Sequence, residues 1–240
     1  MRKLAFIPTR LENALTKVER YLSAAGWDVH YLVNKPSIFE AYTEALKEHK
    51  VLAKDYVIMC HDDIEIIMQP DEFNTVIETA LDDVTGFVGV AGAKKLNKTA
   101  CWWHGLGREF PHPESFLRGC VWHGDNIANS IPTYYGGYGE VEVIDGLFMA
   151  ARGGILNTIT TTQPKEFESK WDYYDMLYSY QATLKGKKNK VIPIMILHHS
   201  PGEGAMTEEW NASRKAFQDK YGDKLEDITL PHQSQLPTQA

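Results

Sequence analysis

The chain has 240 residues, a net charge of −7 and a hydrophobic fraction of 43%. This length suits one large domain or two small ones, and the composition can supply a sizeable core. The acidic balance argues against a large nucleic-acid interface, and no apolar run is long enough to span a bilayer. Three cysteines without metal-ligand spacing, and a proline too early for a secretory signal, predict a reduced, cytoplasmic setting.

The first half of the chain alternates strand and helix patterns. Apolar runs predict four strands, at residues 4–7, 27–33, 56–60 and 87–92. Helical spacing predicts helices between them, at residues 10–25, 38–47 and 71–81. We expect Thr9 to be the N-cap of the first helix, with Glu12 at capping-box spacing, and Ser37 to cap the second. This alternation predicts a parallel, doubly wound α/β sheet with ligands beyond the carboxyl ends of its strands.

The second half is less regular. Residues 101–140 are rich in Trp, Tyr, His, Gly and Pro, and predict a long aromatic loop region with short strands. Further strands are predicted at 140–144 and 191–197, a strand or helix start at 147–151, and helices at 171–185 and 211–221. The polar segment 231–240 is typical of a linker or a disordered tail.

Two polar clusters directly follow buried strands. His61, Asp62 and Asp63 end the strand at 56–60, and His198 and His199 end the strand at 191–197. Carboxylates and imidazoles bind divalent cations such as Mn²⁺ and Mg²⁺, which bridge to substrate phosphates. Adjacent aspartates point in different directions, so one can bind a metal and the other a hydroxyl. The alternative, a polar turn with structural histidines, is weaker because both clusters end strands of one predicted sheet.

A third candidate is the acidic pair in residues 171–175. Asp172 and Asp175 are three residues apart and are expected to share one face of a helix. An acid near a helix start is stabilising without any function, and this explanation is strong for Asp172. Asp175 is therefore the better candidate for chemistry.

The aromatic region and a lysine offer further candidates. Trp102, Trp103 and Tyr138 can present flat faces to sugar rings, although packing of the loops onto the sheet is the better explanation for any single Trp. Lys94, just past the strand at 87–92, can face a phosphate or remain solvated.

Five segments in order resemble GT-A glycosyltransferases of the family 2-like group. They are residues 56–64, 87–92, 143–150, 174–186 and 194–200. The first resembles the strand and D-x-D-type motif, the second the strand that follows it, and the third an acceptor-side strand with an Asp145-Gly146 step. The fourth resembles the helix of the catalytic base, and the last the closing His-Ser segment.

The resemblance implies a GT-A fold, that is, a Rossmann-like, mostly parallel sheet flanked by helices, with an aromatic-rich acceptor side. It implies one domain over residues 1–230, with a nucleotide-sugar half at 1–100 and an acceptor and catalytic half at 101–230. The implied activity is metal-dependent transfer of a sugar from a nucleoside-diphosphate sugar to an acceptor hydroxyl, with inversion of the anomeric configuration. A UDP-sugar is the expected donor, and a glycan is the expected acceptor. Mn²⁺ or Mg²⁺ is the implied cofactor.

The resemblance also implies roles for particular residues. Asp175 matches the general base, and Asp63 matches the metal ligand, with His198 or His199 completing the metal or phosphate site. The resemblance implies donor binding at Pro8, Thr9, Arg10 and Asp62. We add Lys94, Asp145 and Gly146 as donor-side candidates, and Trp102, Trp103, Tyr138 and Asp172 as acceptor-side candidates. Four positions depart from the family pattern: His61 stands for an Asp, Tyr174 for a Glu, Leu177 for an acid later in the same helix, and Tyr42 for an Asn. The metal contact is therefore expected chiefly at Asp63.

Three other functions fit these residues less well. A nucleotidyltransferase that forms nucleotide sugars needs a Gly-rich basic loop after the first strand, and residues 8–13 contain no glycine. A two-metal hydrolase predicts more His-x-His or Asp-x-His spacing than the chain has. A non-catalytic sugar-binding module would not need Asp63, Asp175 and His198 together.

Overall fold

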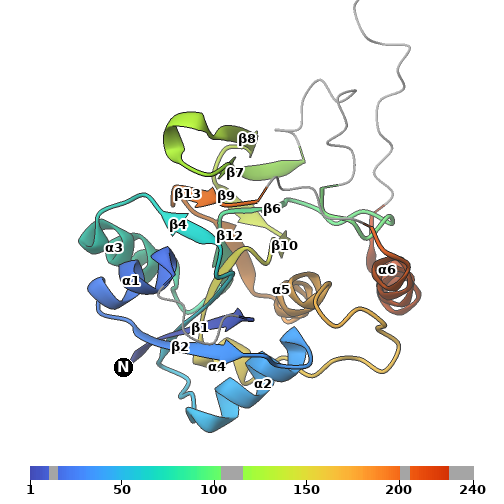
Figure 1. Ribbon diagram of the computed structural model, residues 1–240. Coiled ribbons are helices and arrows are strands. Elements are labelled where there is room, and N and C mark those ends of the chain that lie inside the picture. The colour runs from blue at the N-terminus through green and yellow to red at the C-terminus, as the bar shows by residue number, and fades with distance from the viewer. Residues whose placement is uncertain (11–15, 104–115, 201–205, 227–240) are drawn as a thin grey trace, which may run out of the picture.

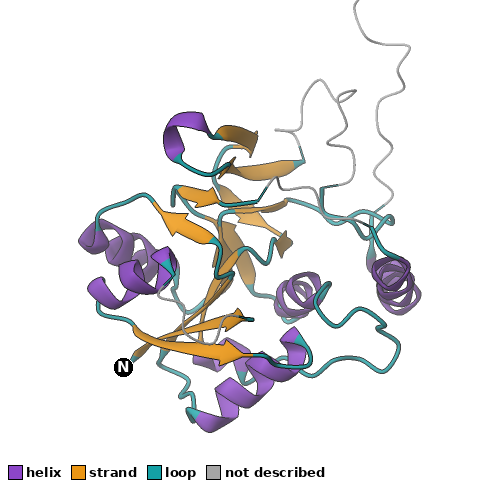
Figure 2. Cartoon of the chain, viewed as in Figure 1, coloured by secondary structure: helices purple, strands orange, loops and turns teal. Residues whose placement is uncertain are grey.

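The computed structural model describes residues 1–10, 16–103, 116–200 and 206–226 of the chain. Its strands form two mixed sheets, and helices pack around them (Figures 1 and 2). The helices are α1 (Lys17–Ala24), α2 (Ile38–Glu48), α3 (Pro70–Ala80), α4 (Gly153–Leu156), α5 (Tyr174–Leu184) and α6 (Glu208–Tyr221), with short 3-10 turns at Ile127–Asn129 and Gly222–Lys224.

The larger sheet has seven strands in the order β2-β1-β3-β11-β5-β12-β9. These are β1 (Lys3–Thr9), β2 (Asp28–Val33), β3 (Tyr56–Cys60), β5 (Thr85–Gly89), β9 (Gly139–Val141), β11 (Phe148–Arg152) and β12 (Lys188–Val191). Strands β2, β1, β3, β5 and β12 run in one direction, whereas β11 and β9 run the opposite way. Because β11 lies between β3 and β5, the two halves of the chain share this sheet.

The second sheet follows the order β10-β6-β7-β13-β4, with β8 paired to β7. Its strands are β4 (Ile64–Ile66), β6 (Ala91–Ala93), β7 (Leu117–His123), β8 (Ile131–Gly136), β10 (Val143–Ile144) and β13 (Ile196–His198). Four segments of the described chain leave the carboxyl end of a strand in the first sheet and enter the second: β3 leads to β4, β5 to β6, β9 to β10, and β12 to β13. These crossings bring the polar strand ends together.

The helices cover both sides of the sheets. α1 and α3 contact each other on one side, and α5 lies on the other (Figure 1). α2 shares the side of α5, because Phe39 and Tyr42 of α2 pack their rings against Tyr178 and Tyr174 of α5. The buried core includes β3 and β5 throughout, as expected for central strands of an α/β sheet. Among the described residues, no helix is long and apolar enough to cross a membrane.

Several local predictions need correction. The first helix begins at Lys17 with Thr16 as N-cap, and the Thr16 hydroxyl accepts a hydrogen bond from the backbone N–H of Glu19. Thr9 instead ends β1, where it pairs with Val33 of β2. The prediction for Ser37 is confirmed, since its side chain accepts from the N–H of Glu40. Glu12 and the predicted tail at 231–240 lie outside the described residues.

Three predicted strands each divide between the sheets. The run at 87–92 becomes β5 and β6, which separate at Val90, the run at 140–144 becomes β9 and β10, and the run at 191–197 becomes β12 and β13. Pro193 lies between β12 and β13 and has no N–H to donate to a strand partner, so the ladder stops there. The helix predicted from Trp171 begins at Tyr174, because Tyr173 adopts a left-handed backbone conformation with φ of 65°.

Candidate active site

Two of the crossings between the sheets, β3 to β4 and β12 to β13, place the predicted polar clusters side by side. His61, Asp62 and Asp63 form the link between β3 and β4. His198 ends β13 and pairs with Ile64, the residue after Asp63. The N–H of His199 donates to the carbonyl of Asp63 at 2.9 Å, which fixes the two segments against each other. Clusters more than 130 positions apart in sequence thus meet through antiparallel pairing of two short strands.

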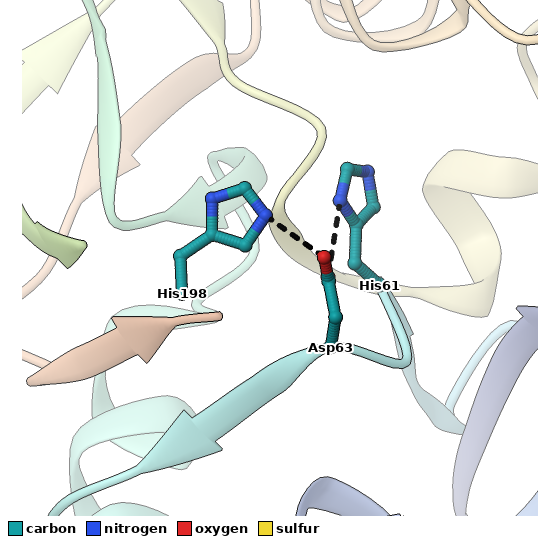
Figure 3. Close-up of side chains that lie close together, drawn as sticks. All are labelled: His61, Asp63 and His198. Carbon is teal, nitrogen blue, oxygen red and sulfur yellow. Dashed lines mark ion pairs between the residues drawn. The ribbon is translucent and has the colours of Figure 1, made fainter. Parts of the chain in front are cut away.

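His61, Asp63 and His198 form a compact group of potential metal ligands (Figure 3). Nε2 of His198 lies 3.3 Å from Oδ2 of Asp63, and Nδ1 of His61 lies 3.9 Å from Oδ1 of the same carboxylate. One ligand atom from each residue falls within 4.8 Å of the others. Oδ1 of Asp63 is buried and has no hydrogen-bond partner among the described residues. A buried carboxylate oxygen without a donor fits a cation between these three side chains.

The protonation states of this group also suit a cation. Burial favours the neutral acid at Asp63, but the hydrogen bond and charge of His198 and the nearby His61 lower the pKa of that carboxyl below its usual value. Removal from water lowers the pKa of His61, against the opposing effect of Asp145 and Asp63. At neutral pH the group therefore offers a carboxylate and a neutral imidazole, which are the forms that bind metals.

His199 lies in a different environment from His198. Its Nε2 is 3.5 Å from Oε2 of Glu65, and its Nδ1 is 3.2 Å from the carbonyl oxygen of Gly124. Glu65 also pairs with Lys17 at 2.7 Å. The structure therefore brings His198, and not His199, into the group with Asp63. It also adds His61, which sequence reasoning did not place among the ligands, although a histidine at that motif position is itself a ligand type.

The predicted donor-binding residues of the first strand meet the same cluster. The Thr9 hydroxyl donates to Oδ2 of Asp62 at 2.6 Å, so the end of β1 and the end of β3 are joined by their side chains. Pro8 pairs with Leu32 in the sheet, just before this contact. The guanidinium of Arg10 lies 5.9 Å from the centre of the Trp171 ring.

Asp175 lies at the N-terminus of α5 and is held by two backbone N–H groups. Its Oδ2 accepts from Gly146 at 2.9 Å, and its Oδ1 accepts from Met176 at 2.8 Å. Burial, followed by the negative charge of Asp145, raises the pKa of Asp175 to about 7, although both backbone hydrogen bonds oppose this. A carboxylate with a pKa near neutrality is suited to accept a proton at physiological pH.

The Asp145-Gly146 step packs directly on the first turn of α5. The N–H of Leu147 donates to Oδ1 of Asp145 at 2.9 Å, which holds the turn. The Tyr174 hydroxyl donates to the Gly146 carbonyl at 2.8 Å. A Cβ at Gly146 would lie 2.2 Å from that hydroxyl oxygen, so this close approach requires glycine. Tyr174 is a second residue that sequence reasoning noted only as a departure from the family pattern.

The structure contradicts the prediction that Asp172 and Asp175 share a helix face. Asp172 precedes α5, and its Oδ2 accepts a hydrogen bond from the Ser169 hydroxyl at 2.6 Å. Between them, Tyr173 holds its positive φ while its hydroxyl donates to the carbonyl of Ala100 at 2.6 Å. A left-handed tyrosine is a strained conformation of the kind found at active sites. Here it sets the direction in which α5, and with it Asp175, leaves the loop.

The predicted acceptor-side aromatics differ in exposure. Trp102 is only 4% exposed, and its ring packs against Trp103 and Tyr135. Trp103 is half-buried and contacts the ring of Trp210 in α6. Tyr138 is 53% exposed, and its carbonyl accepts a hydrogen bond from Arg118.

Lys94 directly follows β6 of the second sheet and feels the charge of the same arginine. It is half-buried, and burial together with the charge of Arg118 lowers its pKa. Its backbone N–H donates to the carbonyl of Phe116.

Comparison with known proteins agrees with this architecture. The chain resembles the structure of GalNAc-T7 with UDP, GalNAc and Mn²⁺, with a TM-score of 0.50 and 10% identity over 92% of this chain and 49% of that one. It thus spans about half the length of that neighbour. Two other structures are too distant to carry an argument. Protein A197 from STIV has a TM-score of 0.46 and 17% identity over 82% of this chain and 85% of that one. A CMP:2-keto-3-deoxy-manno-octonic acid synthetase with CTP has a TM-score of 0.36 and 12% identity over 94% of this chain and 100% of that one.

Sequence comparison identifies the family. A search of curated proteins gives no significant match. The sequence profile of the Glycosyltransferase like family, however, matches residues 12–221, which is most of the chain. The resemblance drawn from the five sequence segments is thereby confirmed, and so is the α/β fold with mixed sheets flanked by helices. This chain belongs to the glycosyltransferase-like family and has a GT-A fold.

Proposed function

We propose that this glycosyltransferase moves a hexose from a UDP-sugar to a hydroxyl of a glycan acceptor, and that the reaction inverts the anomeric configuration. The observation that carries the proposal is that two chemical functions lie close together. Asp175 has a pKa raised to about 7, and the potential metal ligands around Asp63 are connected to it through Tyr174 and Gly146. Proton acceptance and charge neutralisation are the two things that glycosyl transfer from a diphosphate needs.

His61, Asp63 and His198 would hold the divalent cation. Two imidazoles and one carboxylate form a mixed donor set, which favours a transition metal such as Mn²⁺ over Mg²⁺, since Mg²⁺ prefers oxygen ligands. The orphaned Oδ1 of Asp63 supports this assignment. When bound, such an ion supplies positive charge where the diphosphate leaving group becomes more negative.

Asp175 would accept the proton of the acceptor hydroxyl as that oxygen attacks the anomeric carbon. Its two backbone hydrogen bonds fix the carboxylate in place and leave each oxygen with a further lone pair. Attack on the face opposite the leaving diphosphate inverts the configuration. A positioned base of this kind contributes about 10²- to 10⁴-fold to the rate.

The donor would lie along the ends of β1 and β3. Asp62 is oriented by the Thr9 hydroxyl, which leaves its other carboxylate oxygen for a ribose or sugar hydroxyl. Pro8 and Arg10 flank this position, and we assign Lys94, Asp145 and Gly146 to the remaining donor contacts. The UDP and Mn²⁺ that we propose here are also those bound in the GalNAc-T7 structure.

The acceptor would approach from the aromatic side. The exposed ring of Tyr138 and the half-buried ring of Trp103 are better suited to stack on a sugar than Trp102, which is covered by its neighbours. Asp172 is the polar candidate on this side, next to the loop that leads into α5.

The test is thermal unfolding with a panel of nucleoside diphosphates, with and without Mn²⁺. A ligand that binds the native state at a hundredfold excess over Kd stabilises it by about 2.7 kcal/mol. We expect an Mn²⁺-dependent shift with UDP that is lost in Asp63→Ala. The matched control is Asp219→Ala, which removes an exposed carboxylate on α6 and should keep the shift. If no nucleotide shifts the midpoint of the wild-type protein, the proposed donor site is wrong.

A further inference from the structure

Tyr174 connects the two parts of the site. It is the first residue of α5 and its side chain is almost fully buried, directly before the proposed base. Its hydroxyl oxygen lies 2.8 Å from the carbonyl oxygen of Gly146 and 3.4 Å from Nε2 of His61. The same hydroxyl therefore contacts the turn that holds Asp175 and the imidazole of the cation-binding group.

The hydrogen-bond donors available here determine the tautomer of His61. A phenol has one proton, and the shorter contact assigns it to the Gly146 carbonyl, which can only accept. Toward His61 the hydroxyl is then an acceptor, so Nε2 must carry the imidazole proton. The lone pair of neutral His61 is thereby placed on Nδ1, the atom that faces Oδ1 of Asp63 at 3.9 Å (Figure 3).

The position of the hydroxyl is itself fixed by packing. The glycine at position 146 allows the phenol to approach its backbone, since a Cβ there would lie 2.6 Å from Cζ of the ring. The ring of Tyr42 packs at 5.7 Å and that of Tyr178 at 6.0 Å. Tyr174 has little freedom to turn its hydroxyl away from His61.

We propose that Tyr174 is a positioning residue for metal binding, which holds His61 as the Nε2–H tautomer with Nδ1 directed to the cation. This inference rests on the proposed function and adds a residue to its site. Histidine ligands generally donate their second ring N–H to a fixed acceptor, and loss of such an acceptor typically weakens metal affinity by about 10- to 100-fold.

The first test needs no substitution in Tyr174. In metal-free protein labelled with ¹⁵N-histidine, the ring-nitrogen signals that disappear in His61→Ala belong to His61. We expect a protonated Nε2 and an unprotonated Nδ1 in the wild-type protein. An unprotonated Nε2 would overturn the inference.

The second test is Mn²⁺ binding, followed by the electron paramagnetic resonance signal of free Mn²⁺. Tyr174→Phe should raise the Kd for Mn²⁺ by about 10- to 100-fold and abolish the tautomer preference of His61. The matched control is Tyr178→Phe, because Tyr178 is buried on the same helix and its hydroxyl also donates to a backbone carbonyl, that of Thr161, at 2.6 Å. This control should bind Mn²⁺ as the wild type does.

The outcomes separate this inference from the proposed function. If Asp63→Ala weakens Mn²⁺ binding but Tyr174→Phe does not, Tyr174 has no positioning role and the proposed metal site stands. If the wild-type protein does not bind Mn²⁺, or if Asp63→Ala binds it equally well, the metal site and this inference both fail.

Discussion

The free energy of unfolding of Asp175→Asn should increase relative to that of the wild type as the pH rises. In the native protein, burial and the charge of Asp145 raise the pKa of Asp175 from 3.8 to about 7. Between these two values the native state holds a proton that the unfolded chain has released, so the contribution of Asp175 to stability falls with increasing pH. At about 1.36 kcal/mol per pKa unit, the full effect is on the order of 4 kcal/mol once the pH exceeds the native pKa.

The assay is urea unfolding of the wild type and Asp175→Asn from about pH 5 to about pH 8. Asn does not ionise, so the difference between the two proteins isolates this group. We expect that difference to change by about 2–3 kcal/mol over the range, in favour of Asn at high pH. An Asn side chain can accept only through its single oxygen, so one of the two backbone N–H groups loses its partner, but this loss is independent of pH.

A matched control shows whether the trend belongs to the site. Asp219→Asn removes a carboxylate that is 66% exposed on α6 and pairs with Lys215. Its stability difference from the wild type should change little over the same pH range. A flat difference for Asp175→Asn as well would refute the argument that burial and Asp145 raise the pKa of this carboxyl.

Three further predictions follow from the same contacts. If Asp175 is the base, kcat/KM should fall about tenfold per pH unit below about pH 7 and level off above it, and a pH–rate profile without this limb would assign the base elsewhere. Gly146→Ala places a Cβ 2.2 Å from the Tyr174 hydroxyl, so we expect the free energy of unfolding, measured in urea, to fall by about 1–3 kcal/mol. We also expect kcat to fall, and an unchanged kcat would show that the turn moves freely. Asn189→Leu removes a buried amide that accepts from the N–H of Phe87 and donates to two backbone carbonyls. The free energy of unfolding, measured by calorimetry, should fall by on the order of 3 kcal/mol, and a near-neutral result would contradict this.

Much of the fold is visible in the sequence because its signals are local. The buried strand at 56–60 and the helix capped by Ser37 both follow from apolar spacing and capping chemistry. Local signals also explain one error. The pattern Thr-x-x-Glu occurs at Thr9 and again at Thr16, and a sequence alone does not show that Thr9 is committed to β1 through pairing with Val33.

Other features depend on tertiary structure and were not accessible to pattern reasoning. Nothing in residues 148–152 indicates that β11 inserts between β3 and β5 in the opposite direction. The break at Pro193, by contrast, was missed although its signal is local: the strand predicted at 191–197 runs through a residue that cannot donate to a strand ladder. The late start of α5 depends on the conformation of Tyr173, which non-local contacts with Ala100 support.

The candidate site shows the same division. Strand-end clusters pointed to Asp63 and His198, and their proximity follows from the pairing of β4 with β13. The roles of His61 and Tyr174 depend on which atoms face each other across four segments of chain, and such contacts leave no periodic signal. The family pattern drew attention to both positions only because they differ from it.

The most direct test of the account is release of UDP from UDP-hexoses, with water in place of the acceptor hydroxyl. The wild-type protein with Mn²⁺ should release UDP, Asp63→Ala should not, and Asp175→Asn should do so about 10²- to 10⁴-fold more slowly. The anomeric configuration of the freed sugar, read by NMR before it mutarotates, should be opposite to that of the donor. Retention of configuration, or release that continues undiminished in Asp175→Asn, would contradict the mechanism proposed for this site.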